Sequence, residues 1–294
     1  MKIERTIQVA VAENCALGES PVWDDQQRCL HFVDILSNKI YTYWPDDETS
    51  QVTQLDEMVG AIVPTKNLGF LAALPSGIYR LNLPGGTPQI LVQPEPGNLE
   101  NRFNDGKADS SGRLWIATMA QSEQQGLGNM YVVYPDLTFK MVLEKTTISN
   151  GLDWSEDDKY FYHVESDDAQ IRRFDYEKLQ GGILGKTTVV EFPDEEGVPD
   201  GMTIDSEGML WVAHFGGGCV TRRDPSNGEI LEKIELPVKQ VTSCVFGGED
   251  LNDLYITTAS KGLSDSELAY QPQAGYTFVI KNLPFTGRPA NKFG

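Results

Sequence analysis

The chain has 294 residues, and 40% of them are hydrophobic, which is enough for a sizeable core. Its 43 acidic residues outnumber its 24 basic residues and give a formal net charge of −19. Nucleic acid is therefore a poor candidate partner, because phosphate binding needs basic side chains. The sequence shows neither a bilayer-spanning apolar run nor a secretory signal, so we expect a cytoplasmic protein with no membrane partner.

The cysteines and histidines indicate neither disulfides nor a zinc motif. Cys15, Cys29, Cys219 and Cys244 lack Cys-x-x-Cys spacing and lie in or beside strand-like text, so we expect buried, reduced thiols. The three histidines fall inside strand patterns without zinc-site spacing and are expected to be packed or hydrogen-bonded.

Strand patterns begin near the N-terminus and then repeat. Ile3 to Ala12 alternates as a strand but belongs to no complete repeat. The text that follows repeats a strand, a turn and a second strand, most clearly at residues 199–213. With Trp211 as reference, the equivalent residues are His31, Leu71, Trp115, Phe161 and Tyr255, at spacings of 40 to 50 residues.

A repeat of this length, made of short strands, is typical of a β-propeller with one four-stranded sheet per blade. We therefore predict an all-β propeller of six repeats that forms a single domain over residues 1–294. The last repeat, after Thr242, offers only three strand-like runs. The N-terminal strand is predicted to supply the missing outer strand and so to close the ring.

In four of the six repeats, the residue eleven or twelve positions before the reference carries a carboxylate or an amide. These residues are Glu19, Asn104, Asn150 and Asp200. Equivalent positions at the start of the inner strands meet at one mouth of a propeller's channel. Oxygen donors from different blades would then face one point, which is how a hard cation is held.

A second interpretation of these positions is a set of ordinary turns. Asn-Gly and Asp-Gly pairs form turns because these residue types tolerate positive φ. Glu19, however, is not a turn former and lies in the same register, which favours a site.

Two polar segments lie near these positions in the sequence. Gln121 to Gly128 follows the strand of Trp115, and such a loop at a propeller mouth usually shapes a pocket. The charged run from Asp194 to Gly197 precedes Asp200 and is predicted to be a solvated turn.

The motifs around the candidate positions are specific when they are taken together. They are Gly18-Glu19-Ser20-Pro21-Val22-Trp23, Arg102-Phe103-Asn104-Asp105-Gly106-Lys107, Ser149-Asn150-Gly151-Leu152-Asp153-Trp154 and Pro199-Asp200-Gly201-Met202. This set resembles the senescence-marker-protein/gluconolactonase/luciferin-regenerating-enzyme family. The likeness extends through Gln271-Pro272-Gln273-Ala274-Gly275 and so covers nearly the full length.

The resemblance implies a six-bladed propeller with one divalent cation in the central channel. By motif match, its protein ligands would be Glu19, Asn150 and Asp200, with water or substrate completing the shell. The resemblance also implies that Arg102 and Asn104 bind the hydroxyls and carbonyl of a sugar lactone. From the sequence alone, Arg102 fits a surface salt bridge equally well.

A further substrate-contacting glutamate of the family lies shortly before a Gly-x-Leu-Tyr-like strand. Counting back from Gly128 puts Gln124 at that place, with Glu123 beside it. Both are candidate substrate contacts. Glutamine at the place of the family's glutamate suggests a somewhat different polyol preference.

The implied reaction is the metal-dependent opening of a gluconolactone-type sugar lactone. A divalent cation can polarise the ester carbonyl and activate water, and Asp200 would serve as ligand and general base. The sequence does not choose among Ca²⁺, Zn²⁺, Mn²⁺ and Mg²⁺.

Two other functions stay open. One is the hydrolysis of a different ester, with a luciferin-type or phosphotriester-like substrate, by the same scaffold. The other is a non-enzymatic calcium-binding or interaction propeller, although interaction propellers need no converging acidic and amide residues. We expect a monomer, because the ring closes on itself.

Overall fold

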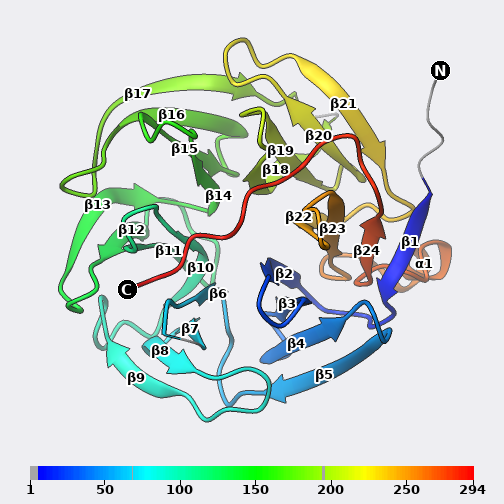
Figure 1. Cartoon of the computed structure of the whole chain (residues 1–294), viewed down its shortest axis with the longest axis horizontal. Coiled ribbons are helices and arrows are strands. Elements are labelled where there is room, and N and C mark those ends of the chain that lie inside the picture. The colour runs from blue at the N-terminus through cyan, green and yellow to red at the C-terminus, as the bar shows by residue number, and fades with distance from the viewer. Residues whose placement is uncertain (1–5, 68, 194–195) are drawn as a thin grey trace.

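The computed structural model describes residues 6–67, 69–193 and 196–294. Within these residues, six four-stranded antiparallel sheets stand around a central axis as the blades of a propeller (Figure 1). The six-bladed all-β architecture is therefore confirmed. Residues 194 and 195, which belong to the charged run predicted to be a solvated turn, lie outside the described residues.

In each blade the chain starts at the channel and moves outward (Figure 1). The innermost strands are β2 (Gly18–Asp24), β6 (Ala61–Pro64), β10 (Asn101–Ala108), β14 (Ser149–Trp154), β18 (Val198–Ile204) and β22 (Val241–Gly247). The second strands are β3 (Cys29–Asp34), β7 (Phe70–Leu74), β11 (Leu114–Ala120), β15 (Tyr160–Glu165), β19 (Leu210–Phe215) and β23 (Asp253–Thr258).

Blades 1 to 5 continue outward with consecutive strands of the chain. Their third strands are β4 (Lys39–Trp44), β8 (Gly77–Leu81), β12 (Gly128–Val133), β16 (Gln170–Glu177) and β20 (Cys219–Arg223). Their outer strands are β5 (Thr49–Gln54), β9 (Gln89–Val92), β13 (Phe139–Thr146), β17 (Gly182–Glu191) and β21 (Ile230–Glu235). No helix among the described residues has the length and apolar character needed to cross a membrane.

Blade 6 is completed by the N-terminus. Its third strand is β24 (Thr277–Ile280), which follows helix α1 (Asp265–Tyr270), and its outer strand is β1 (Ile7–Val11). β1 pairs antiparallel with β24, with Ile7 opposite Ile280. The predicted ring closure is confirmed, while residues 3–5 of the predicted strand lie outside the described residues.

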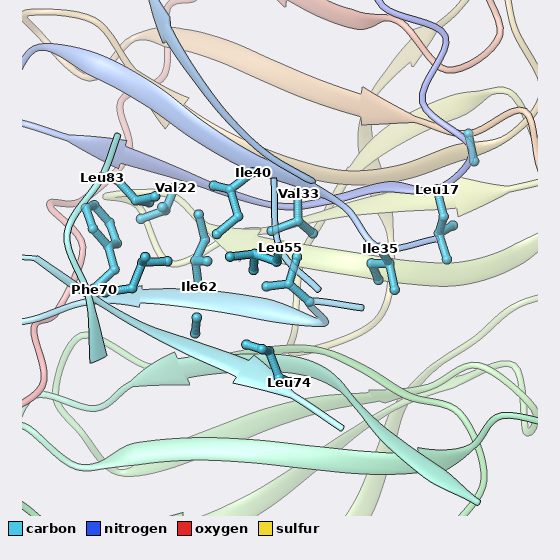
Figure 2. Packing of buried hydrophobic residues seen from close by; sticks show 14 residues of the cluster. Leu17, Val22, Val33, Ile35, Ile40, Leu55, Ile62, Phe70, Leu74 and Leu83 are labelled. Atoms are coloured by element: carbon cyan, nitrogen blue, oxygen red, sulfur yellow. The ribbon is translucent and has the colours of Figure 1, made fainter. Parts of the chain in front are cut away.

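The reference positions of the repeat all lie on second strands and are at most 3% exposed. Three of them contact an aromatic ring on the inner strand of the next blade. The ring centroids are 5.7 Å apart for Trp115 and Trp154, 5.4 Å for Trp211 and Phe246, and 5.7 Å for Tyr255 and Trp23. The repeat therefore marks the packing between blades. Figure 2 shows a mainly aliphatic cluster between blades 1 and 2, where Val22 and Val33 pack with Ile62 and Phe70.

Buried aspartates link the turns to these aromatic residues. Asp205 accepts hydrogen bonds from Nε1 of Trp211 at 3.0 Å and from Nε of Arg222 at 2.6 Å. It also accepts two backbone N–H groups of its own turn. Asp109 likewise accepts from Nε1 of Trp115 at 2.9 Å. The polar edge of each indole is thus satisfied inside the core.

The C-terminal segment, residues 281–294, crosses the ring beyond β24 (Figure 1). Its Thr286 carbonyl accepts from the Ser206 N–H at 2.8 Å, and its Gly294 N–H donates to the Gly112 carbonyl at 3.0 Å. Residues 288–291 and the later parts of the inner strands line a cavity of about 240 Å³. The segment therefore covers the channel end that lies opposite the starts of the inner strands.

Deletion of residues 1–11 should lower the melting temperature by about 10 °C or more. The change removes strand β1, which covers β24. It also removes Val11, which is buried in a cluster with Trp23 and Tyr255. At roughly 2–4 °C per kcal/mol for a large domain, the loss amounts to several kcal/mol. Thermal unfolding by circular dichroism, with deletion of residues 1–5 as control, tests this. An unchanged melting temperature would show that β1 does not support the ring.

Candidate metal centre

The four predicted oxygen donors lie on four inner strands, Glu19 on β2, Asn104 on β10, Asn150 on β14 and Asp200 on β18. Each is only 6 or 7% exposed. Nδ2 of Asn104 donates to Oδ1 of Asn150 at 2.9 Å, and the carboxyl groups of Glu19 and Asp200 are close enough for each to shift the pKa of the other. The structure therefore brings the four side chains together around the channel.

Interrupted strand pairing accompanies the candidate donors. Four inner strands change register against their second strand at or beside these positions, and β22, which carries no candidate donor, also changes register. The shifts fall between Glu19 and Val22, Phe103 and Gly106, Asn150 and Leu152, Pro199 and Met202, and Val241 and Ser243. β6 carries no candidate donor and pairs with β7 without a shift. Because a bulge re-aims a side chain, these irregularities direct the donors away from regular sheet positions.

The glycines that follow two of the donors are required by close approach. A Cβ at Gly151 would lie 2.5 Å from Cβ of Met202, and one at Gly201 would lie 2.1 Å from Oγ of Ser243. Neither glycine has a positive φ, and both lie within strands. The interpretation of these Asn-Gly and Asp-Gly pairs as ordinary turns is therefore wrong.

A hydrogen-bond network fixes the amide of Asn150. Its Nδ2 donates to Oγ of Ser166 at 2.9 Å, and the Ser166 hydroxyl donates to the carbonyl of Pro199 at 2.6 Å. The amide nitrogen of Asn150 is thus engaged on the Ser166 side, and Oδ1 points toward Asn104. Ser166 lies in the loop between β15 and β16. The repeat register does not include this loop, so the sequence pattern did not identify Ser166.

Arg102 lies beside the donors on β10 and is 7% exposed. Its NH1 donates to Oδ1 of Asn104 at 2.6 Å and to the carbonyl of Phe103 at 3.1 Å. Burial lowers the pKa of Arg102, while the charges of Glu19, Glu123 and Asp200 oppose that shift. The alternative of a surface salt bridge is therefore wrong, because the guanidinium is buried at the site.

The charges of the two carboxyl groups are only partly compensated, by Arg102 and, for Asp200, by Lys261. Burial, followed by the charges of Asp200 and Asp105, raises the pKa of Glu19 well above its ordinary value. Burial and the charge of Asp105 likewise raise the pKa of Asp200 well above its ordinary value. In the described part of the chain neither carboxylate forms an ion pair. A divalent cation bound between these two carboxylates would offset their mutual repulsion and the cost of burying them.

The donor chemistry fits a hard cation. Among the described residues, no group of three or more His, Cys, Asp or Glu side chains is arranged to hold a metal ion. The candidate set has a different make-up, with the carboxylates of Glu19 and Asp200 and the oriented amide oxygen of Asn150. Oxygen-only ligands of this kind suit Ca²⁺, Mg²⁺ or Mn²⁺.

The two remaining predicted substrate contacts, Glu123 and Gln124, lie in the loop after β11 and differ in their contacts. Glu123 forms an ion pair with Nζ of Lys261, which comes from the loop after β23. The charge of Lys261 also lowers the pKa of Asp200, so Lys261 belongs to the site although the sequence pattern did not identify it. Gln124 is exposed in the same loop as Glu123. Substrate contact by Glu123 or Gln124 stays a prediction.

Comparison with known proteins defines the family. A family model described as "SMP-30/Gluconolactonase/LRE-like region" matches residues 17–260. Regucalcins from Oryctolagus cuniculus and Homo sapiens are each 38% identical to the chain over 288 residues, covering 96% of both sequences. The chain therefore belongs to the SMP-30/gluconolactonase/LRE-like family, and the resemblance based on the motifs is confirmed.

Solved structures agree with this assignment. A luciferin-regenerating enzyme superposes with a TM-score of 0.91 at 31% identity and covers 98% of this chain and 99% of its own. A calcium-binding protein, regucalcin, from Agrobacterium tumefaciens gives 0.94 at 26% identity, with 99% and 98% covered. A gluconolactonase from Xanthomonas campestris, 19% identical with a TM-score of 0.77 and 94% and 89% covered, shares the fold.

Ser166→Ala should weaken divalent-cation binding about 10–100-fold without unfolding the protein. The change frees Nδ2 of Asn150 from its partner, so the amide oxygen is no longer held in one orientation. Calorimetric titration with Ca²⁺ and Mn²⁺ measures the effect. Ser206→Ala is the matched control, because the Ser206 hydroxyl bonds Thr286 away from the site. Equal affinities for both variants and the unchanged protein would remove Ser166 from the site.

Asp200→Asn should stabilise the metal-free protein at pH 8 but not at pH 4. The folded-state pKa values of Glu19 and Asp200 are raised, so the folded protein holds protons that the unfolded chain has already lost. Stability therefore falls as pH rises from the ordinary carboxylate range through the raised values. Melting temperatures in chelator test this, with the exposed Asp47→Asn as control. A variant that is less stable than the unchanged protein at pH 8 would contradict it.

Proposed function

We propose that the protein is a metal-dependent lactonase that opens a sugar lactone of the gluconolactone type. One observation carries this proposal, namely the pair of buried, only partly compensated carboxyl groups beside an oriented amide and a buried guanidinium. Membership of a family that includes gluconolactonases supports it.

Glu19, Asp200 and Oδ1 of Asn150 would hold one divalent cation at the channel mouth. When bound, such a cation would polarise the ester carbonyl and lower the pKa of a water molecule. The two carboxylates match its charge, and the neutral amide limits the excess of negative charge. Ca²⁺, Zn²⁺, Mn²⁺ and Mg²⁺ are the candidates.

Asp200 is the proposed general base. Its carboxylate would accept a proton from the attacking water as the new carbon–oxygen bond forms at the lactone carbonyl. The ring ester bond then breaks, and the same proton passes to the departing ring oxygen, which leaves a hydroxy acid. The raised pKa of Asp200 brings its proton affinity closer to that of the reacting groups, which favours both transfers.

Arg102 and Asn104 are proposed to orient the substrate. The NH1 group of Arg102 is engaged by Asn104 and Phe103, and in the described chain its other guanidinium nitrogens donate to no protein acceptor. Those N–H groups can hold a lactone oxygen or the carboxylate that forms. Asn104 couples this contact to Asn150 through its own amide.

A second candidate is calcium binding without catalysis, because the similar regucalcin from Agrobacterium tumefaciens is described as a calcium-binding protein. The hydrolysis of a different ester is a third, because the luciferin-regenerating enzyme has a similar structure at 31% identity. Both functions use the same carboxylates. The second involves no substrate turnover, and the third involves a different ester.

Asp200→Asn should lower kcat for gluconolactone about 100-fold or more, because it removes the general base and one cation ligand. Proton release should require a divalent cation, and Glu19→Gln should shift that requirement to higher cation concentration. The assay uses chelator-stripped protein with each of the four cations restored, and Asp47→Asn as control. Full turnover by both site variants would refute the assignment. Cation binding without any lactone turnover would favour the binding function.

A further inference from the structure

The ion pair between Glu123 and Lys261 joins opposite blades. Glu123 follows β11 in blade 3, and Lys261 follows β23 in blade 6. In a ring of six sheets these two blades face each other across the axis (Figure 1). The pair therefore spans the mouth above the candidate metal centre.

The backbone around both residues is held in place. The Lys261 N–H donates to the carbonyl of Ala16 at 3.0 Å, and the Lys261 carbonyl accepts from Nε2 of Gln240 at 3.4 Å. The Glu123 N–H donates to the carbonyl of Ala120 at 2.9 Å. The side chains of Lys261 and Glu123 are 39% and 47% exposed. An ion pair this exposed contributes little stability, so a ligand can replace one partner.

The charges at the mouth do not balance once a cation is present. Glu19 and Asp200 together match a divalent cation, and the charge of Asp105, which also acts on both groups, is opposed by that of Lys107. Two basic groups, Arg102 and Lys261, also lie at the mouth. The single charge of Glu123 can neutralise only one of them. One positive charge therefore remains at the mouth of a chain whose net charge is −19.

We propose that Lys261 selects lactones that carry a carboxylate away from the reacting carbonyl, such as lactones of aldaric acids. This inference rests on the proposed lactonase function and specifies its substrate class. The substrate carboxylate takes the place of Glu123 at the Lys261 ammonium, while the lactone carbonyl lies toward Arg102. Glu123 then turns to solvent.

The test compares two lactones that differ in charge, neutral gluconolactone and glucarolactone. Lys261→Met should reduce the ratio of their kcat/KM values, glucarolactone over gluconolactone, about tenfold, through the KM of glucarolactone. Glu123→Gln should raise the same ratio, because it removes the competing carboxylate. Lys178→Met is the control, since the side chain of Lys178 is 50% exposed and forms an ion pair with Asp158 at 2.7 Å away from the mouth.

Two results would overturn the proposal. One is an unchanged kcat/KM ratio in Lys261→Met. The other is an equal gain of activity toward both lactones, which would mean that the Glu123–Lys261 pair only blocks access to the channel. Rising ionic strength should also increase the KM of glucarolactone in the unchanged protein more than in Lys261→Met.

A binding measurement separates this inference from the proposed function. Calorimetry on the Ca²⁺-loaded protein compares gluconate with glucarate, which differ by one carboxylate and need no turnover. Glucarate should bind about tenfold more tightly, and Lys261→Met should abolish the difference. If no lactone is cleaved but this difference is found, the lactonase proposal fails and the anion selectivity stands. Equal binding of the two acids would contradict the selectivity itself.

Discussion

The inner strands approach one another so closely around the axis that a Cβ atom is excluded at Gly151 and Gly201. This constraint links the fold to the candidate site, because each of these glycines directly follows a proposed ligand. The close approach places Gly151, beside Asn150, against the carbonyl of Asp200 on the neighbouring inner strand. The bulges after the donors belong to the same constraint, since an extra residue turns the side chain out of the ladder. The packing of the inner strands at the axis therefore also sets the positions of the proposed ligands.

Buried aspartates in this molecule have two different roles. Asp205 has an arginine, an indole N–H and two backbone N–H groups as partners, so its negative charge is well compensated inside the core. Asp200 has a second carboxyl group as its neighbour, and burial raises its pKa. The first arrangement stabilises a blade, whereas the second destabilises the metal-free protein. A destabilised pair of this kind is expected where a ligand supplies the missing charge.

The sequence predicted the features that repeat. The spacing from His31 to Tyr255 predicted the blades, and the register of Glu19, Asn104, Asn150 and Asp200 predicted which side chains meet. The incomplete last repeat predicted the pairing of β1 with β24. Features that occur once were not predicted. Ser166 and Lys261 lie in loops of irregular length, and the C-terminal segment crosses the channel without strand periodicity. Contacts of this kind depend on distances across the ring, which the order of residues along the chain does not contain.

The two ends of the channel differ in how their charges balance. At the closed end, Asp105 and Asp153 lie with Lys107 and Arg288, and Nζ of Lys107 donates to Asp153 at 3.0 Å. Glu156 and Asp158 also line this end, and two of its four carboxylates are in ion pairs, Asp153 with Lys107 and Arg288 and Asp158 with Lys178. At the open end, Glu19, Asp200 and Glu123 exceed Arg102 and Lys261 by one negative charge. With both carboxyl groups ionised, a divalent cation therefore changes the net charge of these five groups from −1 to +1. In the proposed mechanism this reversal orders the binding events, because an anionic lactone is repelled until the cation is in place.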